Sequence, residues 1–208
     1  MNIRKIIKSV AAGFITFLAA SQSSYAISVY ADFDGNMLHD ATVTALPGST
    51  LTADVYVRMT ANEVATNGGL NGFGVDLTTG GLRILGDDIN NINIDPQWNF
   101  ATIKDLTDPT IASARVVGNT LTPGGFSDTI VHLFDISLEV PAMVGASYLL
   151  SFADIPGDTF VSNNFFVYDD FVVFADTQVN AVPLPAAAWL MLSGLIGLLG
   201  IARTRRST

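Results

Sequence analysis

A two-residue alternation of apolar and polar side chains runs through the stretch Thr50-Leu-Thr-Ala-Asp-Val-Tyr-Val-Arg-Met59. Its odd-numbered positions are all apolar, whereas Thr, Asp, Tyr and Arg occupy the even-numbered positions between them. Successive side chains of a β-strand point to opposite faces of a sheet, so this pattern predicts a strand with one buried and one exposed face. The stretch therefore predicts a fold built from half-buried sheets.

Similar alternation is found on both sides of this stretch. Phe73, Val75 and Leu77 face one way between small or polar residues, and residues 130–140 place apolar side chains at even-numbered positions. His132 shares that parity, which predicts a buried or edge-lying imidazole rather than a general base. Further strand-like runs lie at 27–33, 82–85, 112–117, 148–152, 164–168 and 171–175, separated by turns rich in glycine and proline.

No segment shows an apolar stripe at helical spacing. Roughly eight or nine short strands, separated by turns, predict an all-β fold, an antiparallel β-sandwich of jelly-roll or Ig/cohesin-like type. Residues 27–176 form this single predicted domain, and residues 177–182 are predicted to be a short linker. The chain has no cysteine, so its core must hold the domain together.

Three motifs resemble the cohesin and carbohydrate-binding sandwich group. They are Pro47-Gly-Ser-Thr50 before a Val-rich strand, Leu70-Asn-Gly-Phe-Gly-Val-Asp-Leu77, and Leu133-Phe-Asp-Ile136 followed by a glycine turn. The Tyr-Asp pair that commonly ends the second element in that group is replaced here by Thr78-Thr-Gly-Gly81. The resemblance therefore implies the fold and does not imply a dockerin ligand.

The N-terminal residues 1–26 have the parts of a secretory signal peptide. Three basic residues come first, and an apolar run follows at 10–20. Ser24 and Ala26 then supply the small −3 and −1 residues that predict cleavage after Ala26 by signal peptidase, following export through the secretion translocon. An uncleaved signal anchor is the alternative interpretation. The absence of cysteine excludes a lipoprotein.

The C-terminal residues 183–208 form a tail of three parts: a Pro-x-Pro lead, an uncharged apolar segment at 186–202 and a basic end at 203–208. Seventeen helical residues span about 25 Å, at the short end of what crosses a bilayer. The tail therefore predicts a transmembrane helix, with its basic end in the cytoplasm. A buried helix of a soluble domain is the alternative.

This tail closely resembles the PEP-CTERM sorting signal of Gram-negative bacteria. Leu184 stands where the namesake Glu of that family often sits. Membership implies recognition by an exosortase, a membrane peptidase that processes the tail near Pro-x-Pro. It also implies transient anchoring in the inner membrane, then release to the cell surface or extracellular matrix of a biofilm-forming host that makes exopolysaccharide. The matching residues are Val182, Pro183, Leu184, Pro185, Trp189, Gly194, Gly197, Gly200, Arg203, Arg205 and Arg206.

Charge is distributed unevenly along the chain. All 19 Asp and Glu lie between Asp32 and Asp176, whereas only four of the ten Lys and Arg lie in that region, so the body has a net charge of −15. Such an acidic body argues against nucleic acid or an anionic membrane as a partner. Its acidity is explained either by solubility or by binding of Ca²⁺ as a cofactor.

Two segments carry candidate calcium ligands. Asp32-Phe-Asp34-Gly-Asn36 resembles the start of a calcium loop, but the twelfth position of an EF-hand would be Val43, so the EF-hand is excluded and a strand-end turn with solvated Asp is favoured. The second segment places oxygen-bearing side chains between isoleucines, which also suits a loop or an edge strand. Its candidate ligands are Asp87, Asp88, Asn91, Asn93 and Asp95.

Catalytic motifs are absent from the sequence, and the lack of cysteine excludes a thiol nucleophile. Glycoside hydrolysis by two carboxylates remains an alternative, although a body of roughly 150 residues is small for such enzymes. Trp98 and Tyr168 are candidates for an exposed glycan-binding platform, with burial in the core as the alternative.

The combined prediction is an exported, exosortase-sorted envelope or matrix protein with no enzymatic activity. Its sandwich would act as a structural or binding module, with exopolysaccharide as the candidate partner. The alternatives are a small carbohydrate-active enzyme and a protein-interaction module of cohesin type.

Overall fold

The computed structural model describes residues 27–85, 89–105, 113–155, 157, 160–168 and 171–182. These residues form a sandwich of two β-sheets, so the predicted all-β sandwich is confirmed. The predicted signal peptide and the predicted tail at 183–208 lie outside the described residues. Within the described ranges, no helix is long and apolar enough to cross a membrane.

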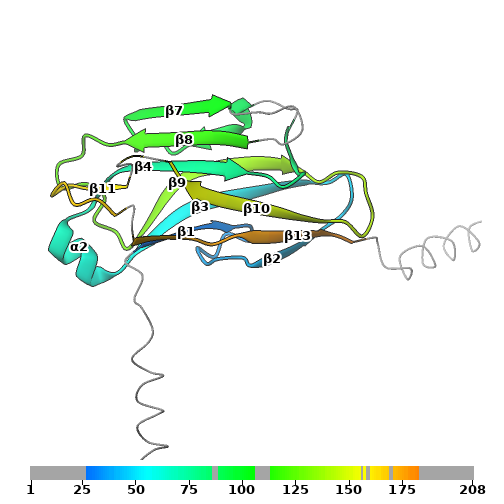
Figure 1. Cartoon of the computed structure of the whole chain (residues 1–208), viewed down its shortest axis with the longest axis horizontal. Coiled ribbons are helices and arrows are strands. Elements are labelled where there is room, and N and C mark those ends of the chain that lie inside the picture. The colour runs from blue at the N-terminus through cyan, green and yellow to red at the C-terminus, as the bar shows by residue number, and fades with distance from the viewer. Residues whose placement is uncertain are drawn as a thin grey trace, which may run out of the picture.

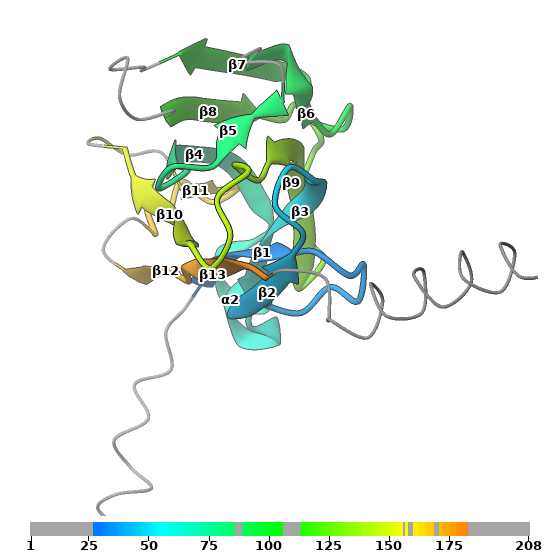
Figure 2. The same ribbon diagram turned by 90° about the vertical axis from the view of Figure 1, so that its right-hand side faces the viewer.

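The first sheet has the strand order β12-β1-β3-β9-β5, and β6 also pairs with β9. Its long central strands β3 and β9 pair in an antiparallel register from Thr50↔Glu139 to Arg58↔Ile130. Figure 2 shows these two strands as a layer beside β4 and β10 of the other sheet. The bounds are β1 (Ile27–Asp32), β3 (Thr50–Met59), β5 (Arg83–Ile84), β6 (Ile92–Ile94), β9 (Ile130–Glu139) and β12 (Val172–Phe174).

The second sheet has the order β2-β13-β10-β4-β8-β7, and β11 pairs with β4. In Figure 1 these strands run in this order from β7 at the top to β2 at the bottom. The bounds are β2 (Thr42–Ala45), β4 (Leu70–Thr78), β7 (Phe100–Asp105), β8 (Ser113–Asn119), β10 (Ser147–Asp154), β11 (Val161–Ser162) and β13 (Thr177–Ala181).

Two strand pairs are parallel, which corrects the fully antiparallel sandwich that was predicted. β1 pairs with β12, and β2 pairs with β13, both in parallel. The physical reason is the path of the chain. β1 lies in the first sheet and β2 in the second, and the last two strands repeat this path in the same direction. β12 therefore lies parallel to β1, and β13 lies parallel to β2. The end of the sandwich is thereby joined to its beginning.

The predicted linker at 177–182 is wrong, because it contains β13. This strand is bonded to β10 on one side and to β2 on the other. Thr177, Val179 and Ala181 are buried, and the backbone N–H of Val182 donates to Ala45 O. The domain therefore extends to the residue immediately before Pro183.

The core fills the space between the inner faces of the two sheets. The odd-numbered side chains of β3 from Ala53 to Met59 are buried, as their alternation predicts. Phe73 of β4 packs near Phe134 of β9, with ring centroids 6.4 Å apart, and so joins the two layers. Burial of these apolar faces is the main stabilising contribution to the sandwich.

A short helix, α2 (Ala61–Asn67), follows β3 and is not predicted by the apolar pattern. None of its residues is buried, which explains why it has no apolar stripe. Its start is instead fixed by a capping box between Thr60 and Glu63. A single 3₁₀ turn, η2 (Ile89–Asn91), precedes β6.

Candidate functional site

Polar side chains gather on the outer face of the first sheet, where β3, β9 and β6 lie side by side. Asp54 of β3 stands directly opposite Asp135 of β9, and Asn93 of β6 stands opposite Asp135 on the other side. His132 lies three residues before Asp135 on β9, and Asp95 immediately follows β6. We call these five residues the His132 cluster.

A β-bulge in β9 brings His132 into this cluster. Val55 pairs with Phe134 and Tyr56 pairs with His132, so Leu133 has no partner in β3. Leu133 and Phe134 are both fully buried, and the side chain of His132 points to the outer face. Parity with the core residues predicted a buried or edge-lying imidazole at His132, but one inserted residue reverses the alternation, so the partly buried ring lies on the outer face.

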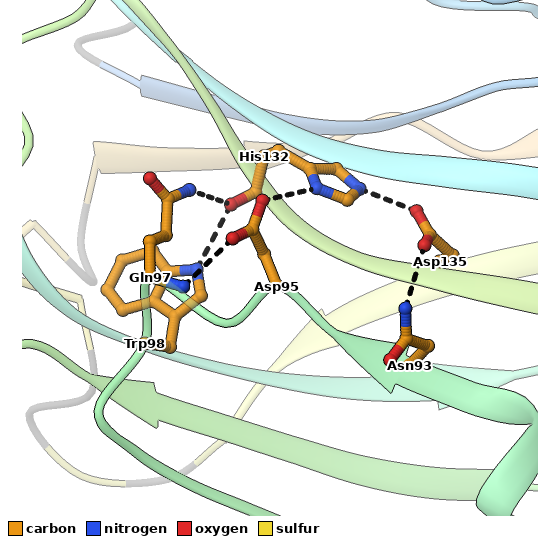
Figure 3. Close-up of polar contacts among 6 residues, drawn as sticks. All are labelled: Asn93, Asp95, Gln97, Trp98, His132 and Asp135. Carbon is orange, nitrogen blue, oxygen red and sulfur yellow. Dashed lines mark hydrogen bonds and ion pairs between the residues drawn. The ribbon is translucent and has the colours of Figure 1, made fainter.

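Both ring nitrogens of His132 face carboxylates (Figure 3). Nδ1 lies 2.9 Å from Asp95 Oδ2, and Nε2 lies 2.8 Å from Asp135 Oδ1. Each carboxylate is held by a second contact. The backbone N–H of Gln97 donates to Asp95 Oδ1 at 2.9 Å, and Asn93 Nδ2 donates to Asp135 Oδ2 at 3.2 Å.

The backbone carbonyl of His132 accepts two side-chain donors. Trp98 Nε1 donates to it at 3.0 Å and Gln97 Nε2 donates at 3.1 Å. The indole ring also packs edge-on against Phe73, with centroids 4.7 Å apart. Trp98 therefore anchors the bulge from inside the core.

The exposed platform predicted for Trp98 and Tyr168 is not formed. Trp98 is only 4% exposed and Tyr168 is fully buried, so neither ring offers a face to a sugar. The exposed rings close to Tyr168 in the sequence are Phe165, Phe166 and Phe171, which we call the aromatic tip, and the ring of Phe166 contacts those of Tyr168 and Phe171. Phe165 is 86% exposed on a turn where its backbone φ is +60°.

Carboxylates dominate the electrostatics of the cluster. Burial and the neighbouring charge of Asp135 raise the pKa of Asp54, although His132 acts in the opposite direction. Burial, together with Asp54, Asp32 and Asp135, raises the pKa of Tyr56 to about 12. The tyrosine therefore stays protonated at neutral pH. The three neighbouring carboxylates give this surface a negative electrostatic potential.

Aromatic rings and one cation continue this face towards β1. The rings of Tyr56 and His132 lie 5.1 Å apart, and Tyr30 stacks on Tyr56 at 6.0 Å. The guanidinium of Arg58 lies 5.4 Å above the ring of Tyr30 and also donates to Met37 O at 3.0 Å. The outer face is thus a continuous row of rings bordered by charges.

The turn at the end of β1 forms as predicted, but Asp32 is buried rather than solvated. Its Oδ1 accepts the backbone N–H groups of Asp34 and Gly35 at 3.0 and 2.9 Å, and its Oδ2 accepts that of Met37. Burial alone would raise the pKa of Asp32, but these hydrogen bonds lower it below its usual value. Asp32 thus stabilises the loop through its own carboxylate.

The second predicted calcium segment does not converge on one point among its described members. Asn91 Nδ2 donates to Leu85 O at 2.6 Å, whereas Asn93 and Asp95 belong to the His132 cluster. Asp87 and Asp88 lie outside the described residues. Calcium binding by this segment, or by Asp32 and Asp34, stays a prediction.

Asp54, His132 and Asp135 were not among the predicted site residues. The alternation in β3 already placed Asp54 on the outer face. Its approach to Asp135 depends on the pairing of β3 with β9, which are about 80 residues apart in sequence. A register prediction for these two strands would have found the pair.

The sequence matches no protein-family model and no curated protein. Solved cohesin structures share the fold. The sixth cohesin of scaffoldin B from Acetivibrio cellulolyticus, in complex with a Cel5 dockerin mutant, is 15% identical over 76% of this chain and 99% of its own, with a TM-score of 0.51. The seventh ScaB type I cohesin from Pseudobacteroides cellulosolvens is 11% identical over 77% and 95%, with a TM-score of 0.49.

At these identities the likeness concerns the fold alone. The chain has a cohesin-like β-sandwich, and the resemblance found in its turns and strands is confirmed at that level.

Proposed function

We propose that this chain is an exported, non-catalytic binding module that its C-terminal tail sorts to the cell surface or matrix. The tail at 183–208 would be a PEP-CTERM signal, anchored in the inner membrane and processed by an exosortase-type peptidase. The body would then act outside the cell as a structural or binding module.

The single observation that carries this proposal is that the first and last described strands lie just inside the predicted processing points. The first strand begins at Ile27, directly after the predicted cleavage at Ala26. The last strand ends at Ala181, and the backbone of Val182 still bonds to Ala45. Removal of both ends would therefore leave every described strand in place.

The experiment is the intact mass and location of the protein in its host, with and without the exosortase. We expect a mature species that begins at Ile27 and ends near Val182, in the matrix or the medium. Replacing Pro183 and Pro185 by Ala should leave a longer, membrane-bound species. Leu184→Glu is the matched control, because it restores the usual family residue and should be processed. Normal processing of the double Pro variant would contradict the proposal.

The partner we propose is exopolysaccharide, bound at the aromatic tip. Phe165 and Phe171 are 86% and 50% exposed, and the rings of Phe166 and Phe171 stack at 6.1 Å. Exposed rings that lie together offer stacking surfaces to sugar rings, and they are uncommon on a surface without a partner. This tip takes the role that was predicted for Trp98 and Tyr168.

Binding can be measured with polysaccharide purified from the host. We expect Phe165→Ala and Phe171→Ala to weaken binding at least tenfold. Phe100→Ala is the matched control, because Phe100 is 60% exposed on β7 in the second sheet and should have no effect. If all three variants bind the polysaccharide as tightly as the wild type does, the aromatic tip is excluded as the binding site. Release of reducing ends that is lost in Asp54→Asn would support the enzymatic alternative instead.

A protein partner is a second candidate, favoured by the outer face of the first sheet. The solved cohesin with a TM-score of 0.51 was crystallised with a dockerin, and the present chain has a similar fold. Capture of one discrete protein that is lost in Arg58→Glu, and kept in the control Lys104→Glu on the second sheet, would favour this candidate. Capture unchanged in Arg58→Glu would contradict it.

A further inference from the structure

We propose that Asp54, His132 and Asp135 form a binding site for a divalent transition-metal ion, with Zn²⁺ as the best match, on the outer face of the first sheet. This inference does not rest on the proposed function. It rests on the convergence of three ligand types from two adjacent strands and on the contacts that orient them.

The three side chains can each offer one ligand atom, and these atoms all lie within 4.8 Å of one another. Zinc ligands of this kind lie about 2.1 Å from the ion, so neighbouring ligand atoms are about 3 to 3.5 Å apart. Nε2 of His132 and Oδ1 of Asp135 are already 2.8 Å apart. Torsional adjustment of the two carboxylates would be enough to close the site around an ion.

The contacts of His132 leave Nε2 available as a ligand. A carboxylate only accepts hydrogen bonds, so Asp95 Oδ2 requires the proton of His132 to be on Nδ1. Nε2 then presents a lone pair to Asp135 Oδ1, and it is buried without a hydrogen bond of acceptable geometry. Two lone pairs 2.8 Å apart repel each other unless a proton or a metal ion is shared between them, and a metal ion bound here would take the place of that proton.

The remaining contacts resemble the outer shell of a metal site. Metal-bound histidines usually donate their second N–H to a carboxylate, which fixes the ring and its tautomer. Asp95 has this position and is itself held by the backbone N–H of Gln97. Asn93 Nδ2 holds the second oxygen of Asp135. The two proposed ligands on β9, His132 and Asp135, are thus oriented before an ion arrives.

The charges of the cluster also favour a cation. Asp54 and Asp135 are directly opposite across the β3–β9 pair, and like charges in this position destabilise a sheet. The raised pKa of Asp54 has the same origin, in part. The side chains of His132 and Asp135 are 23% and 34% exposed, so the cluster lies at the surface, and the buried Nε2 is reached once the Asp135 carboxylate turns aside.

The donor set distinguishes the ion. An imidazole nitrogen combined with two carboxylates suits Zn²⁺ and its neighbours, whereas Ca²⁺ prefers six to eight oxygens. The loop cluster of Asp32, Asp34 and Asp40 has only carboxylates, and Asp32 already uses both of its oxygens for backbone N–H groups. That loop therefore serves as an internal control.

The test is titration of the exported protein with Zn²⁺ after treatment with EDTA, by calorimetry and by thermal unfolding. We expect one ion per chain, a micromolar or tighter Kd and a rise of several degrees in Tm, whereas equal Ca²⁺ should leave Tm unchanged. Loss of an outer-shell partner typically weakens metal binding about 10- to 100-fold, so loss of a direct ligand in His132→Gln or Asp54→Asn should weaken it by at least that much. Asp34→Asn in the loop cluster is the matched control and should bind like the wild type.

A second readout keeps the test independent of folding. Nitrogen NMR of His132 should show Nδ1 protonated and Nε2 bound to metal when Zn²⁺ is present. The proposal is overturned by two results. One is Zn²⁺ affinity that is equal in Asp54→Asn and the wild type. The other is a His132 ring that stays doubly protonated with Zn²⁺ in excess.

Discussion

Asp32 is a buried carboxylate that is held in place by hydrogen bonds from backbone N–H groups. It is 1% exposed, yet its two oxygens accept three backbone N–H groups of the following turn. A buried charge is costly unless it is fully hydrogen-bonded, and these contacts meet that requirement. Asp32 therefore connects the end of β1 to the loop that leads to β2.

We expect Asp32→Asn to destabilise the sandwich by about 1 to 3 kcal/mol at neutral pH, because the amide NH₂ would face the donor of Met37. The sign of the pH effect follows from the lowered pKa of Asp32. Its contribution is present above the unfolded value of 3.8 and is lost as the pH falls through the folded pKa. Urea unfolding at pH 7 and pH 3 should show that the difference in the free energy of unfolding between the variant and the wild type is smaller at pH 3. A constant gap would contradict this account.

Gly118 of β8 is required by its neighbour across the pair. A Cβ at this position would lie 2.3 Å from a ring carbon of Phe73, which stands opposite it in β4. Phe73 cannot move freely, because it packs against Trp98 and Phe134. We expect Gly118→Ala to cost about 1 to 3 kcal/mol in the free energy of unfolding. Gly124→Ala is a control for added bulk, because a Cβ there meets nothing within 4 Å, although its positive φ carries its own strain. A larger loss in the control than in Gly118→Ala would exclude the steric explanation.

At the scale of elements, β13 makes the sharpest prediction. A chain that ends at Asp176 would lose this strand and expose the edges of both β10 and β2. We expect it to unfold at a much lower temperature than a chain that ends at Val182, or to aggregate through its free edges. Thermal unfolding of the two chains decides the point. If the two chains have equal midpoints of thermal unfolding, residues 177–182 contribute nothing to stability and act as a linker.

For helix α2 we expect little effect on global stability, in contrast to β13, because the helix contributes no buried residue. Thr60→Ala removes the side-chain oxygen that accepts the N–H of Glu63, a cap worth about 1 kcal/mol locally. We expect faster hydrogen exchange at the amide of Glu63 with little change in the midpoint of global unfolding. Ser49→Ala, in another turn, should leave exchange in α2 unaffected.

The sequence predicted the elements whose pattern is local. Residues 50–59 and 73–77 alternate because each strand has a core face, and both lie within observed strands. The bulge at Leu133 could not be seen, because its cause is the pairing of β9 with β3. β13 was missed because its short alternation includes the polar Thr177 on the buried face. The same dependence on pairing concealed the contact of Asp54 with Asp135.

At the scale of the whole molecule, charge is the dominant feature. The body has 19 acidic and four basic side chains, so its net charge of −15 opposes compaction. We expect Tm to rise as NaCl is raised from about 0.01 to 0.3 M, because the Debye length falls from about 30 Å to below 10 Å. Sucrose at equal osmolality controls for general solute effects. A fall in Tm over this range would show that attractive pairs outweigh the repulsion.

The positions of the first and last strands have a mechanical consequence. β1 begins beside Met59, near helix α2, whereas β13 ends beside Ala45 at the other end of the sandwich (Figure 1). Tension applied between these two points would pull along the strands. The ladder bonds of β1 and β13 lie across that direction, so they would share the load in shear rather than open one at a time.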